Sequence, residues 1–589
     1  MRTVHDLVIR GGTVVDGTGG RSRVADVAID GTRITVVGTV DGPARETLDA
    51  RGLLVTPGFV DVHTHYDAQA TWDAELAPSS WHGVTTVVLG NCGVGFAPAR
   101  PDRREWLIGL MEGVEDIPGA ALAAGMRWDW ETFPEYLDAL ARMPRVIDVG
   151  AQVPHGALRA YVMGERGAAN EPATADDIAT MGRLVREALD AGALGFTTSR
   201  TVGHRGVDGQ PVPGTFAPED ELMGIGKALA AARRGVFEVA QAGVGGRTSG
   251  DPTGAAETEV AWMVRLSAAI ARPVSFLLMQ TDDEPDAWRR LLALADEAAG
   301  QGANLVPQVA ARPFGMLAGH QSRANPFADR PTYRELAMLP LPERVLRLRD
   351  PEVRRRILAE RAVAGAKPGT LAALFGPAMF ARLFPLGEPP DYEPAADASV
   401  AALAARENRE PDAVLYDLML GHDGRELLFF PILNYAACTA EPLREMILHP
   451  RSVLGLGDGG AHCGVVCDAS MTTFMLTHWV RDRQRGPRIP LETAVRALTH
   501  DPAALYGLDD RGVLRPGSKA DLNLIDLERL QLRLPEMAFD LPTGARRLVQ
   551  RADGYVATIV SGEVVMREGT PSGRRPGRVI RHGPDLHRP

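Results

Sequence analysis

The sequence predicts the α/β fold class, with a parallel (β/α)8 barrel inserted into a β domain that both chain ends build. Three observations support this prediction. From residue 58 onward, strand-like and helical segments alternate, which is typical of parallel βα units. Short strands and turns occupy both ends of the chain. A long stretch rich in Leu, Ala, Arg and Glu interrupts the alternation, which indicates a helical insertion.

The two chain ends each contain a hairpin pattern. Asp30-Gly31 separates two strand-like segments near the amino terminus, and this dipeptide suits a tight hairpin turn. Ser561-Gly562 separates two further strand-like segments near the carboxyl terminus. Because the amino-terminal strands look incomplete alone, we expect residues 1–57 and 509–589 to form one composite β domain.

Residues 58–508 are expected to form a (β/α)8, TIM-like barrel, whose active site would lie at the carboxyl ends of its strands. The interval from about 316 to 450 is too long for one connection, so we expect a helical insertion on the catalytic side of the barrel. A lid and a plain packing extension both remain open for it. The eight expected strands are Phe59–His63, Thr85–Gly90, Val146–Val153, Leu194–Thr198, Val236–Gln241, Val274–Met279, Asn304–Val309 and Val453–Gly457.

The composition excludes several classes of protein. Asp and Glu outnumber Lys and Arg by 75 to 64, which argues against a nucleic-acid partner. Four irregularly spaced cysteines are no disulfide framework. We find neither the apolar segment of a signal peptide nor a run of about 18 apolar residues that would span a membrane. We therefore expect a cytoplasmic protein without a membrane partner, whose basic segment 574–581 is solvated or clasps a domain.

A pair of histidines, His63 and His65, follows the first barrel strand in the segment Pro57–His65. Side chains at positions i and i+2 of a strand point the same way, so both imidazoles project to one side at the carboxyl end of this strand. Two histidines placed in this way can share one metal ion. Taken alone, the pair fits two hydrogen-bonded histidines at a strand end better than a metal site. Asp458, at the end of the last strand, is a neighbour of this pair when the barrel closes.

Four motifs together resemble the amidohydrolase superfamily, which comprises metal-dependent hydrolases on a (β/α)8 barrel with a composite β-sandwich. They are RGGTVVDGTG at 10–19, VTPGFVDVHTHYDA at 55–68, GLGDGGAH at 455–462 and RGVLRPGSKADLNLID at 511–526. Three shorter segments resemble the N-acyl-D-amino-acid deacylase (D-aminoacylase) branch of this superfamily: Asn91–Gly93, Pro154–Arg159 and Gly192–Ser199. The resemblance covers essentially the whole chain.

The resemblance implies a zinc site at His63, His65, Cys92 and Asp458, with Asp458 also acting as the proton shuttle. Cys92 taken alone is also compatible with a buried apolar role. The family usually offers further histidines on the fifth and sixth strands, and this chain has none there. We therefore expect one zinc ion rather than two.

In the segments where the family has those histidines, Glu238 and Gln280 are the only plausible oxygen ligands. Glu238 is equally compatible with a buried, hydrogen-bonded carboxylate inside the barrel. The sequence leaves open whether either residue replaces a missing histidine.

Four residues are candidates for substrate binding. Arg159 and Arg312 follow the third and seventh strands, and an arginine suits the carboxylate of an acyl amino acid. His155 is a candidate for polarising a carbonyl group, and His462 for hydrogen bonding to the substrate. Structural roles remain open for all four, as salt-bridge partners for the arginines and as packing or supporting groups for the histidines.

The sequence is therefore interpreted as a hydrolase of non-peptide amide bonds that uses metal-activated water, with Asp458 as general acid and base. Its expected partner is a small molecule such as an N-acyl amino acid, and a homo-oligomer remains open. Two alternatives remain. One is a cyclic amide hydrolase or deaminase of the same superfamily, and the other is a metal-free homologue that binds a ligand without catalysis.

Overall fold

The computed structural model describes residues 4–360 and 375–581. Among these residues, eight parallel strand positions form the barrel, and β8 and β9 together occupy the third. The predicted (β/α)8 barrel is thereby confirmed. The strands are β6 (Phe59–Asp61), β7 (Val84–Leu89), β8 (Asp148–Ala151), β9 (Val153–Pro154), β10 (Gly195–Ser199), β11 (Val236–Ala240), β12 (Val274–Leu277), β13 (Leu305–Val309) and β17 (Val453–Leu454).

The barrel closes between its first and last strands. The backbone N–H of Asp458 donates to the carbonyl oxygen of His63 at 3.1 Å, so the segments that follow β17 and β6 lie side by side. An added Cβ at Gly457 would lie 2.1 Å from a carboxylate oxygen of Asp61, so a side chain at this position would displace that carboxylate. The closure therefore places the segment that contains His63 beside the segment that contains Asp458.

The barrel helices form because their local signals agree with their packing. Helix α6 (Ala175–Ala191) begins with a capping box between Thr174 and Asp177 and ends at Gly192 with φ 113°. Its buried residues recur every three or four positions, which places one apolar face on the barrel. Other helices around the barrel include α3 (Phe133–Arg142), α4 (His155–Met163), α7 (Glu219–Ala232), α9 (Ala255–Ile270), α10 (Ala287–Gly300), α20 (Leu491–Leu498) and α21 (His500–Leu505).

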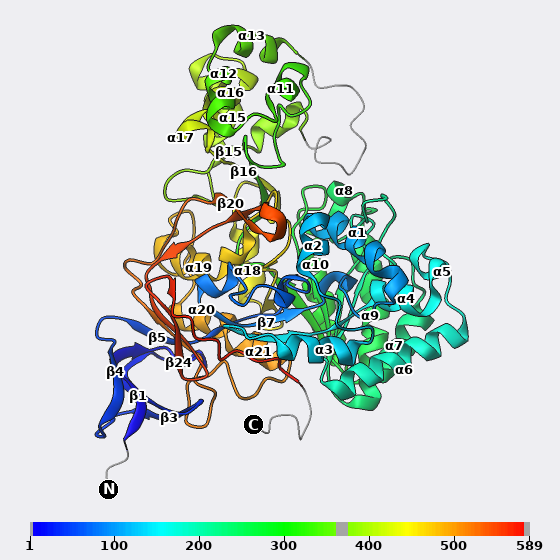
Figure 1. Cartoon of the computed structure of the whole chain (residues 1–589), viewed down its shortest axis with the longest axis vertical. Helices are drawn as coiled ribbons and strands as arrows, with labels where there is room; N and C mark the ends of the chain where they lie inside the picture. The colour runs from blue at the N-terminus through cyan, green and yellow to red at the C-terminus, as the bar shows by residue number, and fades with distance from the viewer. Residues whose placement is uncertain (1–3, 361–374, 582–589) are drawn as a thin grey trace.

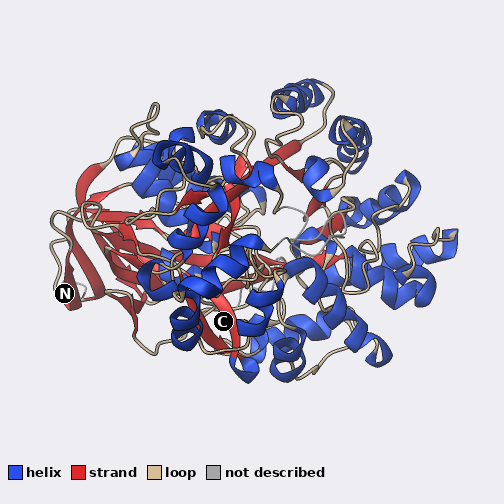
Figure 2. Ribbon diagram, turned by 90° about the horizontal axis from the view of Figure 1, so that it is seen from above, coloured by secondary structure: helices blue, strands red, loops and turns tan. Residues whose placement is uncertain are grey.

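Strands from both chain ends pair in one sheet beside the barrel (Figure 1). Figure 2 shows this strand-rich end near the amino terminus, with the helix-rich end opposite. The domain boundaries at 57/58 and 508/509 stay a prediction. The nine strands of this sheet within the described residues are β1 (His5–Val14), β2 (Arg23–Asp30), β3 (Arg33–Gly38), β4 (Ala44–Asp49), β5 (Leu54–Pro57), β18 (Leu522–Ile525), β23 (Tyr555–Val560), β24 (Glu563–Arg567) and β25 (Thr570–Pro571).

Buried ion pairs and the chain end connect the barrel to this sheet. Asp148 of β8 accepts a hydrogen bond from Arg511 at 2.7 Å and forms an ion pair with Lys519 at 3.0 Å. The segment that contains Ile580 runs along β8, and its N–H donates to the carbonyl oxygen of Val149 at 2.7 Å. The basic tail therefore packs against the barrel as far as residue 581.

The segment after β13 leaves the carboxyl end of that strand and contains a lobe that projects from the rest of the molecule (Figure 1). It has its own apolar core, and helices dominate it. Residues 361–374, which belong to the predicted insertion, lie outside the described residues. The elements are β14 (Phe314–Ala318), α11 (Pro331–Leu336), α12 (Leu341–Leu348), α13 (Pro351–Ala359), β15 (Phe384–Pro385), α15 (Val400–Glu407), α16 (Pro411–Met419), α17 (Gly421–Gly424) and β16 (Leu428–Leu433). No described helix is both long enough and apolar enough to cross a membrane.

Candidate metal centre

The two histidines after β6 lie buried at the carboxyl end of the barrel. His63 and His65 are 1% and 2% exposed, and their ring centroids are 5.4 Å apart. The backbone N–H of the intervening Thr64 donates to the carbonyl oxygen of Val88 at 3.2 Å, which ties this segment to the neighbouring β7. Both rings therefore face the same enclosed space.

Cys92 brings a thiol to the same space. It follows β7 with φ 53°, a left-handed conformation that non-glycine residues rarely adopt. Its Sγ lies 3.3 Å from Nε2 of His63. One potential ligand atom each from His63, His65 and Cys92 lies within 4.8 Å of the others. These three side chains can reach a common ion.

Asp458 completes the cluster from the last strand. Its backbone is also left-handed, with φ 45°. Its Oδ1 lies 3.7 Å from Nε2 of His63 and 3.7 Å from Nε2 of His65. Strained backbone of this kind concentrates at functional sites, because the surrounding fold has to hold it in place. Two imidazoles, a thiol and a carboxylate thus converge from three strand ends.

The electrostatics of the cluster favour a cation. Burial raises the pKa of Glu238 and of Glu115 to about 8, and raises that of Asp458 well above its usual range. Burial also lowers the pKa of His63 to about 4 and lowers that of His65 well below its usual value. Among the described residues, no Lys or Arg side chain forms an ion pair with these acids, so they lack an offsetting positive charge. A divalent cation would supply that charge, and this donor set suits zinc.

Gln280 and Glu238, the possible replacements for the missing histidines, occupy different surroundings. The side-chain amide of Gln280 donates to the carbonyl oxygen of Pro285 at 3.0 Å and accepts from the N–H of Ala436 at 3.1 Å, so a loop holds it. Glu238, on β11, lies inside the barrel 3.8 Å from Nδ1 of His63. Both of its carboxylate oxygens are buried without a hydrogen-bond partner among the described residues. Glu238 is therefore the one of the two that faces the cluster.

Two predicted substrate-binding residues, His155 and Arg159, lie in a separate buried network. His155 hydrogen bonds to Thr198 and to Glu221, each at 2.9 Å, and Arg159 pairs with the same Glu221. These contacts satisfy the charge of Arg159 inside the protein. The predicted substrate role of both residues stays a prediction.

Arg312 is likewise paired, whereas His462 lies beside the cluster. Arg312 binds Asp468 at 2.6 Å and stacks 3.9 Å from the ring centre of Tyr392. His462 lies with Nε2 3.6 Å from Glu115, and its side chain is 34% exposed. Of the four predicted substrate-binding residues, only His462 joins the cluster in the described structure.

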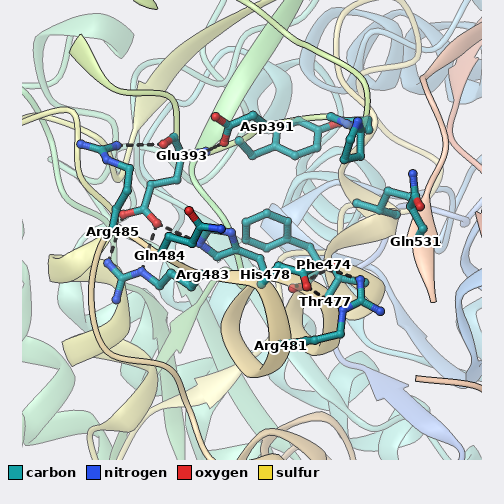
Figure 3. Close-up of a pocket in the computed structure, with 15 residues that line it drawn as sticks. Asp391, Glu393, Phe474, Thr477, His478, Arg481, Arg483, Gln484, Arg485 and Gln531 are labelled. Carbon is teal, nitrogen blue, oxygen red and sulfur yellow. Dashed lines mark hydrogen bonds and ion pairs between the residues drawn. The ribbon is translucent and has the colours of Figure 1, made fainter. Parts of the chain in front are cut away.

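A separate cavity of about 350 Å³ lies outside this cluster, with none of the predicted site residues in its lining (Figure 3). Its most buried acid, Glu393, is already paired. Glu393 accepts hydrogen bonds from Arg483 at 3.0 Å and forms one with His478 at 2.9 Å. The pairing leaves no free charge on Glu393 for a ligand, so the cluster remains the candidate site.

Two residues of the site were not predicted from the sequence. Gln308 on β13 lies with Oε1 3.0 Å from Nδ1 of His63, and Glu115 lies with Oε1 3.3 Å from Nδ1 of His65. Gln308 sits near the end of a predicted strand, a position that marks it as a candidate. Glu115 ends helix α1 (Arg104–Glu115) in a long connection, and no local pattern points to it.

Known proteins resemble this chain over its whole length. An N-acyl-D-glutamate deacylase from Alcaligenes xylosoxydans xylosoxydans is 29% identical, over 99% of this chain and 97% of its own. A D-aminoacylase from the same organism is 27% identical, over 98% and 97%. The structure of an N-acyl-D-glutamate deacylase from Bordetella bronchiseptica, complexed with zinc and a phosphonate inhibitor, has the same fold, with a TM-score of 0.63 and 24% identity over 98% of this chain and 100% of that one.

These relatives confirm the expected resemblance to the D-aminoacylase branch. The sequence pattern of the amidohydrolase family matches residues 46–566, which is most of the 589-residue chain. The chain belongs to the amidohydrolase family.

Proposed function

We propose that this chain is a zinc-dependent hydrolase that cleaves the amide bond of N-acyl amino acids, with N-acyl-D-amino acids as the expected substrates. It acts on carbon–nitrogen bonds other than peptide bonds. The observation that supports this most directly is the convergence of His63, His65, Cys92 and Asp458 at one end of the barrel. The two relatives described above, an N-acyl-D-glutamate deacylase and a D-aminoacylase, suggest the substrate class.

His63, His65, Cys92 and Asp458 would hold a single ion. When bound, zinc supplies positive charge that lowers the pKa of water to about 7 and polarises a carbonyl group. The buried carboxyl group of Glu238, 3.8 Å from His63, lies beside the site and would ionise more readily with a cation bound there. Catalytic zinc keeps one position open, so either the site expands to five ligands or one of the four residues stands outside it.

Asp458 performs the proton transfers. Its carboxylate lies 3.7 Å from both imidazoles, and its side chain is 10% exposed. It therefore contacts the proposed ligands of the ion and is still partly accessible. It takes a proton from the attacking water and returns it to the leaving nitrogen, which would otherwise be a poor leaving group. The buried surroundings keep bulk water from competing for this proton.

A panel of substrates tests the proposal. We expect the zinc-loaded protein to hydrolyse N-acyl-D-amino acids, and to release the free amino acid, faster than it hydrolyses hydantoins or deaminates aminopurines. The L-enantiomers are the matched control for stereochemistry. Activity confined to the ring compounds would replace the proposal with a cyclic amide hydrolase or deaminase. Absence of turnover on the whole panel, together with absence of bound metal, would favour a non-catalytic homologue.

A further inference from the structure

Glu115 is an acid on the apolar face of a helix. Helix α1 buries Leu107, Leu110, Met111 and Val114, and Glu115 follows them at 1% exposure. A carboxylate in such a position is costly unless other groups hold it. The side chains that contact this carboxylate indicate what its role is.

The carboxylate of Glu115 lies between two histidines from opposite ends of the barrel sequence. One oxygen is 3.3 Å from Nδ1 of His65, after the first strand, and the other is 3.6 Å from Nε2 of His462, after the last. The backbone N–H of His462 also donates to the carbonyl oxygen of Glu115. One residue thus contacts both segments that bring the cluster together.

Nδ1 of His65 has no hydrogen-bond partner of ideal geometry among the described residues, although it is buried. Its Nε2 faces Asp458. For Nε2 to present a lone pair to an ion, the proton of a neutral imidazole has to sit on Nδ1, and a buried N–H needs an acceptor. The Glu115 oxygen is the carboxylate in reach of that proton.

We propose that Glu115 is a positioning residue that accepts the Nδ1–H of His65 and thereby directs Nε2 of this ring toward the metal. The inference rests on the proposed function, because it assumes that His65 is a ligand. With a cation bound nearby Glu115 ionises more readily, and its negative charge then makes the imidazole a stronger ligand, as carboxylates behind metal-bound histidines do. His63 has a different support, since Nδ1 of that ring meets the neutral amide of Gln308 at 3.0 Å.

Zinc affinity, measured by competition with a chromogenic chelator, tests this role without relying on activity. Glu115→Leu keeps the position apolar and removes the acceptor, so we expect zinc affinity to fall by about 10- to 100-fold. Glu115→Gln retains an acceptor without charge, and we expect a smaller loss. Glu112→Leu, one turn earlier on the same helix, is the matched control and should bind zinc as the unaltered protein does.

Circular dichroism and thermal unfolding of each variant show whether the fold is retained. Affinity equal to that of the unaltered protein in Glu115→Leu would overturn the inference. Should that variant fail to fold, Glu115→Gln decides alone, and unchanged affinity there overturns it. Failure of the unaltered protein to bind zinc would instead overturn the proposed function, so the two failures are distinguishable.

Discussion

Replacing Asp458 by Asn removes the proposed proton acceptor while keeping the shape of the side chain. The backbone at this position has φ 45°, a conformation that Asn adopts as readily as Asp. The backbone N–H that bonds to His63 is unaffected by the change. The substitution therefore isolates the chemistry of the carboxylate from the closure of the barrel.

The expected loss follows from the role of the carboxylate. A positioned general acid and base contributes about 10²- to 10⁴-fold to the rate, so the activation barrier should rise by about 3–5 kcal/mol. Because this interaction forms in the transition state, kcat should fall far more than KM changes. Asp458 is also a proposed ligand, with Oδ1 3.7 Å from both imidazoles. The zinc content of the variant therefore has to be measured together with kcat, because loss of zinc would also lower the rate.

The assay is steady-state hydrolysis of an N-acyl-D-amino acid at saturating zinc. Asp423→Asn is the matched control, because Asp423 has the same left-handed backbone, with φ 54°, and lies exposed in the projecting lobe. We expect that control to keep full activity. A kcat for Asp458→Asn within about threefold of the unaltered protein, with zinc retained, would refute the assigned role.

The ion pairs beneath the barrel give two further predictions. Arg511→Ala removes one of the two cations that pair with the buried carboxylate of Asp148, together with its hydrogen bond at 2.7 Å. Because Lys519 remains, the free energy of unfolding in urea should fall by about 1.5–3 kcal/mol, whereas the exposed Arg515→Ala should change little. A urea midpoint of Arg511→Ala equal to that of the unaltered protein would contradict this prediction. Burial opposes ionisation of Asp148, but Lys519 and Arg511 outweigh it and lower its pKa to about 2. Since this pKa lies below the value in the unfolded chain, the pairs stabilise the protein above about pH 4, and thermal unfolding should shift to lower temperature as the pH falls from 4 toward 2. An unchanged unfolding temperature over that range would rule the contribution out.

The sequence predicts the barrel well because its strands are buried on both faces. Segments such as Val236–Gln241 and Val274–Met279 read as apolar runs between helical segments, and both are strands in the structure, β11 and β12. The convergence of the His63 and Asp458 segments also follows from sequence order, because the first and last strands of a closed barrel are neighbours.

The partners of the buried arginines were beyond prediction. Residue type and strand position nominate Arg159 and Arg312 for a substrate carboxylate, but the distant acids Glu221 and Asp468 already neutralise them. Such pairs depend on tertiary packing, and no local pattern encodes them. Glu115 was not predicted for the same reason, since tertiary packing of its helix places it beside the site.

Zinc titration of the metal-depleted protein tests the central claim most directly. The donor atoms of His63, His65 and Cys92 within 4.8 Å of one another, with Asp458 beside them, predict one tight equivalent. Hydrolysis of an N-acyl-D-amino acid should then recover in proportion to the first equivalent added. Binding below about a tenth of an equivalent, with no activity restored by excess zinc, would contradict the metal-dependent mechanism.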